Sequence, residues 1–325
     1  MPDRPVFVTG AAGFIGSTLV EALLRSGRSV IGVDNFNDYY DPARKRSHVE
    51  SIRHDPRFSL HEVDIRDTAV MRELFSRHRP RAVAHLAAYG GVRYSIGRAP
   101  LYTDVNITGS INLLEAARET EPEVFVFAST SSVYGHAPQG TFVETDPCDR
   151  PLAPYPASKR AVELLGYTYH NLHGLNFTAV RLFSVYGPRG RPDMMPFIMT
   201  DRIARGEKIT LFEGGCMKRD WTYVDDVVSG LMVALDRPLG CEIINLGRGD
   251  PVLMTDMVRM IEDLIGAKAD LDTSPAPSSE PKVTVANIDK ARRLLGYEPR
   301  TSVEEGLERL WQWYQKHVAV GSRTI

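Results

Sequence analysis

The stretch Gly10-Ala11-Ala12-Gly13-Phe14-Ile15-Gly16 decides the fold of this 325-residue chain. It directly follows the apolar run Val6-Phe7-Val8-Thr9 and leads into a segment with helical periodicity, Thr18 to Ser26. Glycines at this spacing let the backbone turn tightly and approach a pyrophosphate, whose charge is stabilised by the free N–H groups at a helix N-terminus. Because the pattern stands between a strand and a helix, it predicts a dinucleotide site rather than a simple turn.

Two acidic residues extend this prediction. Asp34 ends the second apolar run, about 20 residues after the glycines, where an acid accepts hydrogen bonds from the ribose hydroxyls of the adenosine. A carboxylate there repels a 2′-phosphate, so the sequence favours NAD over NADP and disfavours an NADP-dependent reductase. Asp64 follows the third apolar run. It has two interpretations, contact with the adenine edge or capping of the next helix.

The first half of the chain alternates apolar runs with helical segments. The continuous apolar character of the runs is typical of a parallel sheet covered on both faces. Alternating strands and helices predict an α/β fold, a Rossmann-type doubly wound sheet. The predicted strands are Val6 to Thr9, Val30 to Val33, Phe58 to Val63, Ala82 to Ala87, Val124 to Ala128 and Thr178 to Leu182, and the helices include Thr18 to Ser26, Thr68 to Arg77 and Asn106 to Arg118.

The pattern becomes shorter and more broken from about Pro188. We therefore expect an NAD-binding domain over residues 1–187, including the helix of Tyr155, and a smaller mixed α/β substrate domain over 188–325, with the chain free to cross between them. The second half is predicted to contain a helix over Phe197 to Arg205, a strand at Ile209 to Phe212, a loop over Glu213 to Asp220, a helix from near Asp225, a strand at Glu242 to Leu246, a helix capped at Thr255, an irregular connection over Ser274 to Pro281, and a last helix opened by the capping box Ser302-Val303-Glu304-Glu305.

Composition limits the kinds of partner. A net charge of -2 gives no general attraction to nucleic acid or to anionic membranes. No apolar stretch approaches the ~20 residues of a membrane span, and the first apolar run at Val6 leaves no room for a signal peptide. The three cysteines form no close-spaced pair, which indicates a reduced, cytoplasmic protein. The nine histidines show no metal-binding grouping, so no metal is expected.

A candidate acid/base pair lies in Pro154-Tyr155-Pro156-Ala157-Ser158-Lys159. Residues four apart on a helix share a face. A free phenol titrates near pH ~10, and an ammonium group one turn away lowers that pKa, which produces a base able to take a proton from an alcohol. The spacing is common by itself, and it gains meaning from the dinucleotide site before it.

Taken together, these residues resemble the extended short-chain dehydrogenase/reductase family of nucleotide-sugar enzymes. The resemblance also includes His85-Leu86-Ala87-Ala88 after the fourth strand and Ser129-Thr130-Ser131-Ser132-Val133-Tyr134-Gly135 after the fifth. It implies that Tyr155 is the acid/base and that Lys159 lowers its pKa and holds the nicotinamide ribose. It further implies that Thr130 bonds the 4-hydroxyl of the sugar, with Ser131 and Ser132 as neighbouring contacts. The implied NAD contacts are Gly10, Gly13, Phe14, Ile15, Gly16, Asp34, Asn35, Asp64, Ile65, Leu86, Ala87, Ala88 and Lys159.

Relatives that dehydrate their sugar carry an Asp-Glu pair directly after this Thr. Ser131 and Ser132 stand there, and hydroxyls cannot supply the acid and base that elimination of water needs. A dehydratase is therefore disfavoured.

Several stretches are similar to the branch of the family that epimerises UDP-glucuronate. They run from Asp34 to Pro42, Gly91 to Ser95, Val185 to Met194 and Met217 to Asp220. The resemblance places Arg191 and Ser184 on the substrate carboxylate, and a planar guanidinium suits that group. Whether the nearby Arg189 also contacts the substrate, or belongs to a solvated basic loop, stays open. The resemblance places Arg219 on the diphosphate. Arg93, expected on a loop that faces the same cleft, is placed on the diphosphate or the carboxylate. A departure at Glu280-Pro281-Lys282-Val283, where relatives carry Pro-Gly-Asp-Val, leaves the uridine-ribose contacts open.

The sequence thus predicts a UDP-glucuronate 4-epimerase that works through a 4-keto intermediate with bound NAD. The alternatives are a UDP-glucuronate decarboxylase, a UDP-glucose 4-epimerase or, from another class, a non-catalytic NAD-binding regulator. Helices at Asn106 to Arg118 and Ala161 to Asn171 pair two subunits in relatives, so the resemblance also implies a homodimer.

Overall fold

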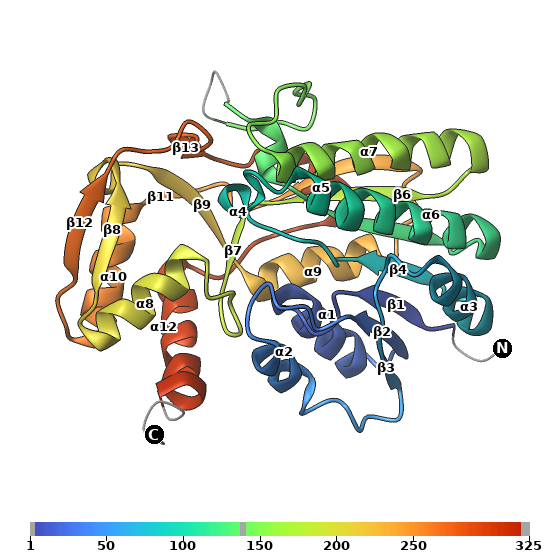
Figure 1. Ribbon diagram of the computed structural model, residues 1–325, viewed down its shortest axis with the longest axis horizontal. Coiled ribbons are helices and arrows are strands. Elements are labelled where there is room, and N and C mark those ends of the chain that lie inside the picture. The colour runs from blue at the N-terminus through green and yellow to red at the C-terminus, as the bar shows by residue number, and fades with distance from the viewer. Residues whose placement is uncertain (1–3, 137–140, 320–325) are drawn as a thin grey trace.

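A seven-stranded sheet dominates the computed structural model, which describes residues 4–136 and 141–319 (Figure 1). All its strands are parallel, in the order β10-β6-β5-β4-β1-β2-β3. The strands are β1 (Val6–Thr9), β2 (Val30–Asp34), β3 (Phe58–Glu62), β4 (Ala82–His85), β5 (Val124–Thr130), β6 (Phe177–Leu182) and β10 (Cys241–Leu246). The six strands predicted from the first half are confirmed, with small shifts at their ends.

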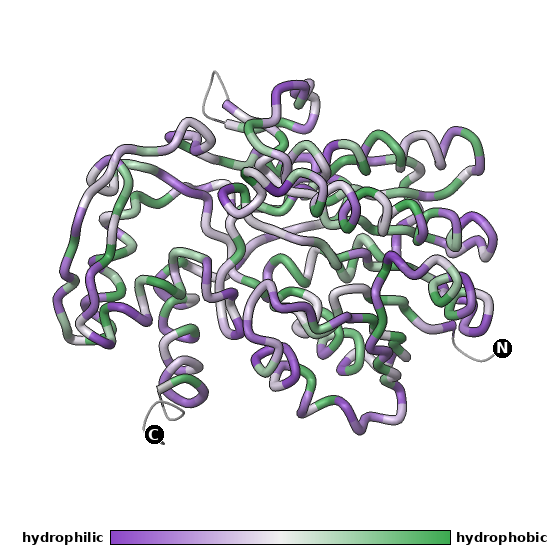
Figure 2. The backbone as a smooth tube through the Cα atoms, viewed as in Figure 1, coloured by the Kyte–Doolittle hydropathy of each residue, from purple (hydrophilic) through white to green (hydrophobic). Residues whose placement is uncertain are grey.

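Helices cover both faces of this sheet because successive strand residues point to opposite sides. Val6 and Val8 pack with α1 (Phe14–Arg25) and α9 (Val224–Ala234) on one face. Phe7 packs with α3 (Thr68–His78), α6 (Gly109–Thr120) and α7 (Pro154–His173) on the other. Figure 2 shows hydrophobic stretches along these strands and helices and hydrophilic stretches in the loops around them. The doubly wound Rossmann-type fold is confirmed.

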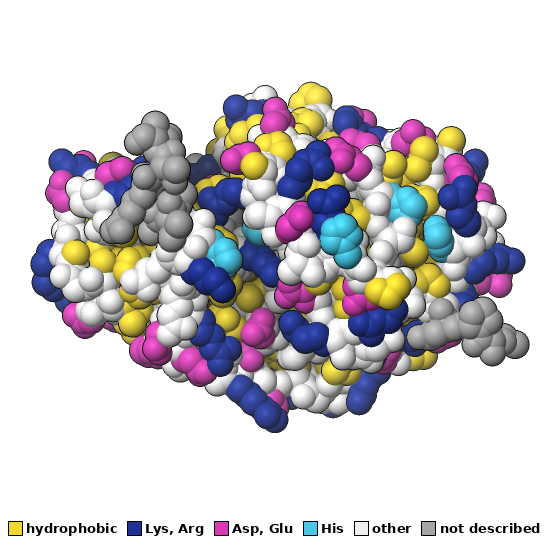
Figure 3. All heavy atoms as spheres, turned by 90° about the horizontal axis from the view of Figure 1, so that it is seen from below, with side chains coloured by type: hydrophobic (Ala, Val, Ile, Leu, Met, Phe, Trp, Pro, Cys, Tyr) yellow, Lys and Arg dark blue, Asp and Glu magenta, His cyan; other side chains and the backbone are white. Residues whose placement is uncertain are grey.

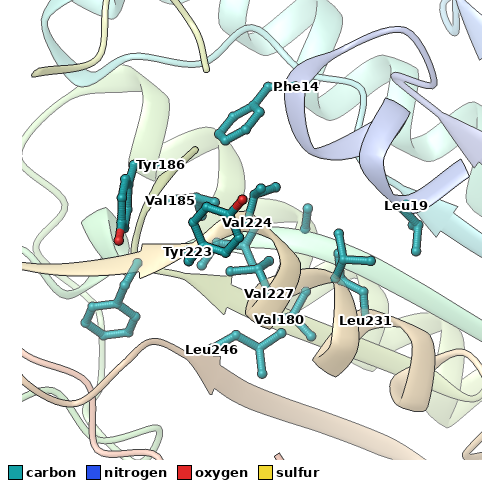
Figure 4. Packing of buried hydrophobic residues seen from close by; sticks show 14 of the residues in the cluster. Phe14, Leu19, Val180, Val185, Tyr186, Tyr223, Val224, Val227, Leu231 and Leu246 are labelled. Carbon is teal, nitrogen blue, oxygen red and sulfur yellow. The ribbon is translucent and has the colours of Figure 1, made fainter. Parts of the chain in front are cut away.

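The chain crosses between its two parts. Strand β10 lies beyond residue 188 yet pairs with β6 in the large sheet, and α9 packs against α1. Figure 4 shows Val224, Val227 and Leu231 of α9 beside Val180 of β6 and Leu246 of β10. A boundary at residue 187 therefore separates the two parts in sequence but not in packing.

The smaller part is a mixed α/β layer, as predicted. Its central strand β9 (Lys218–Tyr223) is parallel to β7 (Ser184–Tyr186) and β13 (Val283–Thr284) and antiparallel to β11 (Pro251–Leu253). A separate parallel pair joins β8 (Lys208–Phe212) and β12 (Asp270–Ser274). The helices here are α8 (Met195–Arg205), α10 (Met254–Ile265) and α12 (Val303–Tyr314), and α11 (Asp289–Leu295) packs beside β10.

The remaining elements are short. They are α2 (Pro42–Val49), α4 (Val92–Ser95), α5 (Ala99–Tyr102), the π-helical turns η1 (Thr103–Thr108) and η4 (Gln315–Ala319), and the 3-10 turns η2 (Ser131–Tyr134) and η3 (Glu213–Gly215).

Four local predictions are corrected. The predicted loop over Glu213 to Asp220 ends in β9, so Arg219 lies on a strand and not in a loop. Thr255 is not a helix cap, because β11 runs straight into α10 through Leu253. Arg93 lies on the short helix α4 rather than in a loop. The helix predicted over Asn106 to Arg118 begins as the π-helical η1. The capping box is confirmed at Ser302, whose side chain accepts a hydrogen bond from the Glu305 N–H at 3.1 Å.

Candidate active site

One cavity of about 820 Å³ gathers the residues that the sequence singles out. It follows the carboxyl ends of the parallel strands, where ligands bind in open α/β sheets, and continues to the smaller part of the molecule. Its lining includes every predicted site residue, namely Gly10, Gly13, Phe14, Ile15, Gly16, Asp34, Asn35, Asp64, Ile65, Leu86, Ala87, Ala88, Arg93, Thr130, Ser131, Ser132, Tyr155, Lys159, Ser184, Arg191 and Arg219.

The glycine turn forms one end of the cavity. Gly10 has a φ of 69°, a conformation that favours glycine, and the N–H of Gly13 donates to its carbonyl at 2.9 Å. A Cβ on Gly16 would lie 1.9 Å from the Gly10 oxygen, so α1 starts this close to β1 only because position 16 has no side chain. The N-terminus of α1 therefore opens directly into the cavity, as a pyrophosphate requires.

Asp34 lies buried beside this turn. Its carboxylate accepts hydrogen bonds from the N–H groups of Ala12 at 3.1 Å and Phe36 at 2.9 Å. Burial raises the pKa of Asp34, and Lys45, whose Nζ is 3.9 Å from the carboxylate, opposes that rise. Lys45 also lines the cavity, but sequence reasoning could not select it, because it is one of 39 lysines and arginines.

Asp64 does not cap the following helix. Asp67 does so, by accepting a hydrogen bond from the Val70 N–H at 3.1 Å. The side chain of Asp64 accepts instead from Asn35 Nδ2 at 2.8 Å and from Arg66. The hydrogen bonds from Arg66 lower the pKa of Asp64 to about 2. The capping interpretation is therefore wrong, and Asp64 and Asn35 lie together at the adenosine end that the glycine turn predicts.

A buried polar relay fixes the cavity wall after β4. Thr9 Oγ1 accepts hydrogen bonds from the N–H groups of Leu86 and Ala87, so its own proton goes to His85 Nδ1, 2.8 Å away. His85 Nε2 then donates to Ser110 Oγ at 2.8 Å. Burial lowers the pKa of His85 well below its usual value, so the ring is neutral and the relay holds its shape.

Tyr155 and Lys159 lie in the first two turns of α7, and both side chains line the cavity. The Lys159 Nζ lies 4.5 Å from the centre of the Phe127 ring, and burial lowers the Lys159 pKa to about 7, with Glu163 opposing that shift. Burial raises the pKa of Tyr155. The charge of Arg191 opposes this rise most strongly, and a hydrogen bond with Thr130 opposes it to a smaller degree. In the structure, Arg191 is thus the cation that acts on the phenol, while the influence expected from Lys159 stays a prediction.

Arg191 is paired with a carboxylate of the chain itself. Its Nε and Nη2 donate to the two oxygens of Asp193 at 2.9 and 2.7 Å. The guanidinium lies 5.3 Å from the centre of the Tyr39 ring, and the Tyr39 hydroxyl donates to Asp193 at 3.0 Å. Burial would raise the Asp193 pKa, but the bonds from Arg191 hold it below its usual value. Sequence reasoning missed Tyr39 and Asp193, although both lie in stretches that it quoted.

The far end of the cavity holds a second cationic group. Arg219 Nη2 donates to Glu280 at 2.9 Å, and Arg93 Nε lies 3.7 Å from the other Glu280 oxygen. Ser184, on β7, lines the same cavity. Arg189 points elsewhere and pairs with Glu21 of α1 at 2.5 Å. Glu280 stands in the stretch that departs from the usual pattern, so the departure lies directly in the site.

Comparison with known proteins defines the class of this fold and site. Residues 6–247 match the model of the NAD dependent epimerase/dehydratase family, and the chain belongs to that family. It is 43% identical to a UDP-glucuronate 4-epimerase of Thermodesulfobacterium geofontis over 96% of both chains. The crystal structure of a UDP-glucuronic acid 4-epimerase from Bacillus cereus with UDP-glucuronic acid and NAD superposes with a TM-score of 0.91 at 35% identity, covering 96% of this chain and 99% of that one. A UDP-glucose 4-epimerase from Thermotoga maritima with UDP-glucose gives a TM-score of 0.88 at 32% identity, covering 96% and 99%.

The cavity fits the cofactor of this family. The glycine turn, Asp34 and Lys159 all line the cavity, in the places where this type of fold is expected to bind the pyrophosphate and the two riboses of a dinucleotide. Within residues 4–136 and 141–319, no cluster of His, Cys, Asp and Glu could hold a metal ion, and no helix is long and apolar enough to cross a membrane.

Proposed function

We propose that this chain is a UDP-glucuronate 4-epimerase, which interconverts UDP-glucuronate and UDP-galacturonate through a 4-keto sugar with bound NAD. The observation that carries the proposal is Arg191, a cation placed in the same cavity as Tyr155, close enough to act on its pKa. A neutral sugar has no group that requires this cation, whereas a uronic acid carries a carboxylate at C5. The similarity to UDP-glucuronate 4-epimerases over nearly the whole chain supports the same reading.

The reaction begins at the C4 hydroxyl of the sugar. Tyr155 takes the hydroxyl proton, either directly or through Thr130, with which it is hydrogen-bonded. Bound NAD would supply the hydride chemistry at C4, in both directions, so that no free nicotinamide would be consumed. Lys159 holds the nicotinamide ribose and, as a cation, favours the phenolate form of Tyr155.

A uronic acid brings a hazard that a neutral sugar lacks. Its 4-keto form is a β-keto acid, which loses carbon dioxide when the breaking C–C bond aligns with the ketone. Hydrogen bonds from Arg191 and Ser184 would keep the carboxylate ionised and out of alignment. At the other end, Arg219 and Arg93 would bind the diphosphate, and Glu280 would stand next to the uridine side.

The decisive experiment follows UDP-glucuronate by proton NMR in the presence of the purified protein. Epimerisation yields UDP-galacturonate, decarboxylation yields a UDP-pentose, and no change would favour the non-catalytic regulator. Turnover of UDP-glucose but not of UDP-glucuronate would favour the neutral-sugar epimerase.

Tyr155→Phe should abolish conversion while the protein retains NAD, and Arg191→Ala should strongly lower kcat/KM for UDP-glucuronate. Normal turnover by Tyr155→Phe would remove the base from the mechanism.

We also infer a homodimer formed through α6 and α7, and a cytoplasmic location. Helix α7 exposes Leu164, Tyr167 and Leu172 by 56%, 61% and 64%, and Leu164 and Tyr167, which are three residues apart, share one helical face. A second copy of the chain is a suitable cover for such an apolar face. The cytoplasmic location rests on the cysteines, since Cys148, Cys216 and Cys241 are all free.

A further inference from the structure

Asp193 presents to Arg191 the same chemical group that the substrate would present. The two side chains meet through two charge-assisted hydrogen bonds, and both line the cavity that holds Tyr155. The side chain of Asp193 is 42% exposed and that of Arg191 is 25% exposed, so a ligand in the cavity can reach either partner. The Tyr39 hydroxyl, which comes from the segment after β2, donates a hydrogen bond to Asp193.

Arg191 retains donors for a second carboxylate. A guanidinium has five N–H groups. Asp193 uses Nε and one hydrogen of Nη2, and Nη1 has no hydrogen bond to the residues that the structure describes. Nη1 points at Gly90, where a Cβ would lie only 2.5 Å away. The missing side chain of Gly90 therefore gives Nη1 its space. Gly90, Arg191 and Asp193 all line the cavity, so a ligand carboxylate can reach the guanidinium beside Asp193 or take its place.

Epimerisation imposes a special demand on this contact. The hydride leaves one face of C4 and returns to the other, so the sugar ring must turn between the two half-reactions. Its carboxylate must then leave Arg191 and come back. A buried or half-buried cation that loses its only partner is strongly destabilised. A guanidinium whose sole partner was the substrate would hold the ring in one orientation.

We propose that the Asp193 carboxylate takes the place of the substrate carboxylate. It keeps Arg191 paired while the sugar carboxylate dissociates from Arg191 and the ring turns. Tyr39 positions Asp193 for this exchange. The inference rests on the proposed function and deepens it, because it makes the Arg191–Asp193 pair a specificity element for uronic acids that weakens ground-state binding and speeds turnover.

The test is Asp193→Asn, a substitution of equal size that removes the charge. It should bind UDP-glucuronate about tenfold more tightly, the effect of roughly one strengthened charge-assisted hydrogen bond, and bind UDP-glucose as the unmodified protein does. In turnover of UDP-glucuronate, KM and kcat should both fall. A larger share of the bound nicotinamide should stand in the reduced form at steady state, because the ring is released slowly. Tyr39→Phe should show the same changes to a smaller degree.

Asp256→Asn provides the matched control, since Asp256 also pairs with an arginine, Arg259, but on the exposed side of α10. It should match the unmodified protein in every measurement. A higher KM for Asp193→Asn without accumulation of reduced nicotinamide would overturn the proposal and leave Asp193 only orienting Arg191. Equal tightening of UDP-glucose would overturn it as well. If the unmodified protein forms no UDP-galacturonate, the proposed function fails, while the binding comparison still decides whether Asp193 competes for Arg191.

Discussion

Among single residues, His48 links the cofactor turn to pH. Its Nδ1 donates to the Ala12 carbonyl at 3.0 Å, while Asp34 accepts from the Ala12 N–H, so these two side chains hold Ala12 from both sides. The His48 pKa is lowered from 6.5 to about 4, chiefly by burial; the hydrogen bond to Ala12 opposes this shift, and Arg189, Arg44 and Lys45 contribute to it. The folded protein therefore contains a neutral His48 over a range in which the unfolded chain is protonated.

We predict that acidification weakens the fold through this residue. Between pH 6.5 and pH 4 the unfolded state binds more protons at His48 than the folded state does. The stability contributed by the neutral His48 is therefore present above pH 6.5 and is lost as the pH falls toward 4. From pH 7 to pH 5 the loss should be about 2 kcal/mol of unfolding free energy. Denaturant unfolding of the unmodified protein and of His48→Gln at both pH values measures it, and the variant should lack that loss. His54→Gln, at an exposed site, is the control. Equal pH dependence in both variants would show that His48 is not the titrating group.

Residues of the candidate site divide into those that sequence could identify and those that it could not. Parallel strands bring their carboxyl ends to one edge, so Asp34, Thr130 and Tyr155 could be placed in one cavity from their positions after strands or on the next helix. Tyr39 and Asp193 meet across 154 positions of sequence, between two irregular loops. No periodicity predicts such a contact, and the partner of Arg191 became visible only in the structure.

Helix α7 shows how one element carries the catalytic pair. One turn beyond Lys159, the buried Glu163 accepts hydrogen bonds from Ser129 of β5 at 2.5 Å and from Nε and Nη2 of Arg181 of β6 at 3.0 and 2.8 Å. Arg160 adds a fourth bond at 2.9 Å. Because Arg181 is only 1% exposed, Glu163 is the carboxylate that makes its burial tolerable.

Glu163→Gln should therefore destabilise the protein by about 3 kcal/mol, because it leaves the Arg181 guanidinium buried without a counter-charge. The double variant Glu163→Gln/Arg181→Met should regain most of this loss, since it removes the charge as well. Urea unfolding of both variants gives the comparison. Glu119→Gln, which breaks exposed pairs on α6, should change stability by less than about 1 kcal/mol. A double variant no more stable than Glu163→Gln would contradict the argument.

Elements were predictable where a strand is buried on both faces. The runs of β1, β2, β4 and β5 are almost wholly apolar, which is the pattern of a covered parallel strand. Strand β9 reads Lys-Arg-Asp-Trp-Thr-Tyr and has no such run, yet it is the centre of the smaller sheet. Its Asp220 is fully buried and accepts hydrogen bonds from the N–H groups of Arg248, Gly249 and Ala286, so loops distant in sequence stabilise this strand.

Helix α7 has an apolar surface that the part of the chain described by the structure leaves uncovered. Over the face that Figure 3 shows, Lys and Arg side chains are interspersed with Asp and Glu side chains. Helices α6 and α7 lie side by side on another part of the molecule (Figure 1), and there α7 exposes Leu164, Tyr167 and Leu172. Packing these side chains against a second copy removes apolar area from water at roughly 25 cal/mol per Å².

We therefore predict that the protein has twice its chain mass of 36.2 kDa in solution and that Tyr167→Glu shifts it toward the monomer. A charge at the centre of an apolar interface has no partner and cannot be solvated there, so association weakens by orders of magnitude. Light scattering coupled to gel filtration measures the mass. Leu271→Glu makes the same kind of change at Leu271 of β12, exposed by 46% and outside this helix pair, and should leave the mass unaltered. A dimer that survives Tyr167→Glu but dissociates with Leu271→Glu would place the interface on the smaller part of the molecule. If the unmodified and the variant protein are both monomers, the proposed dimer interface does not exist.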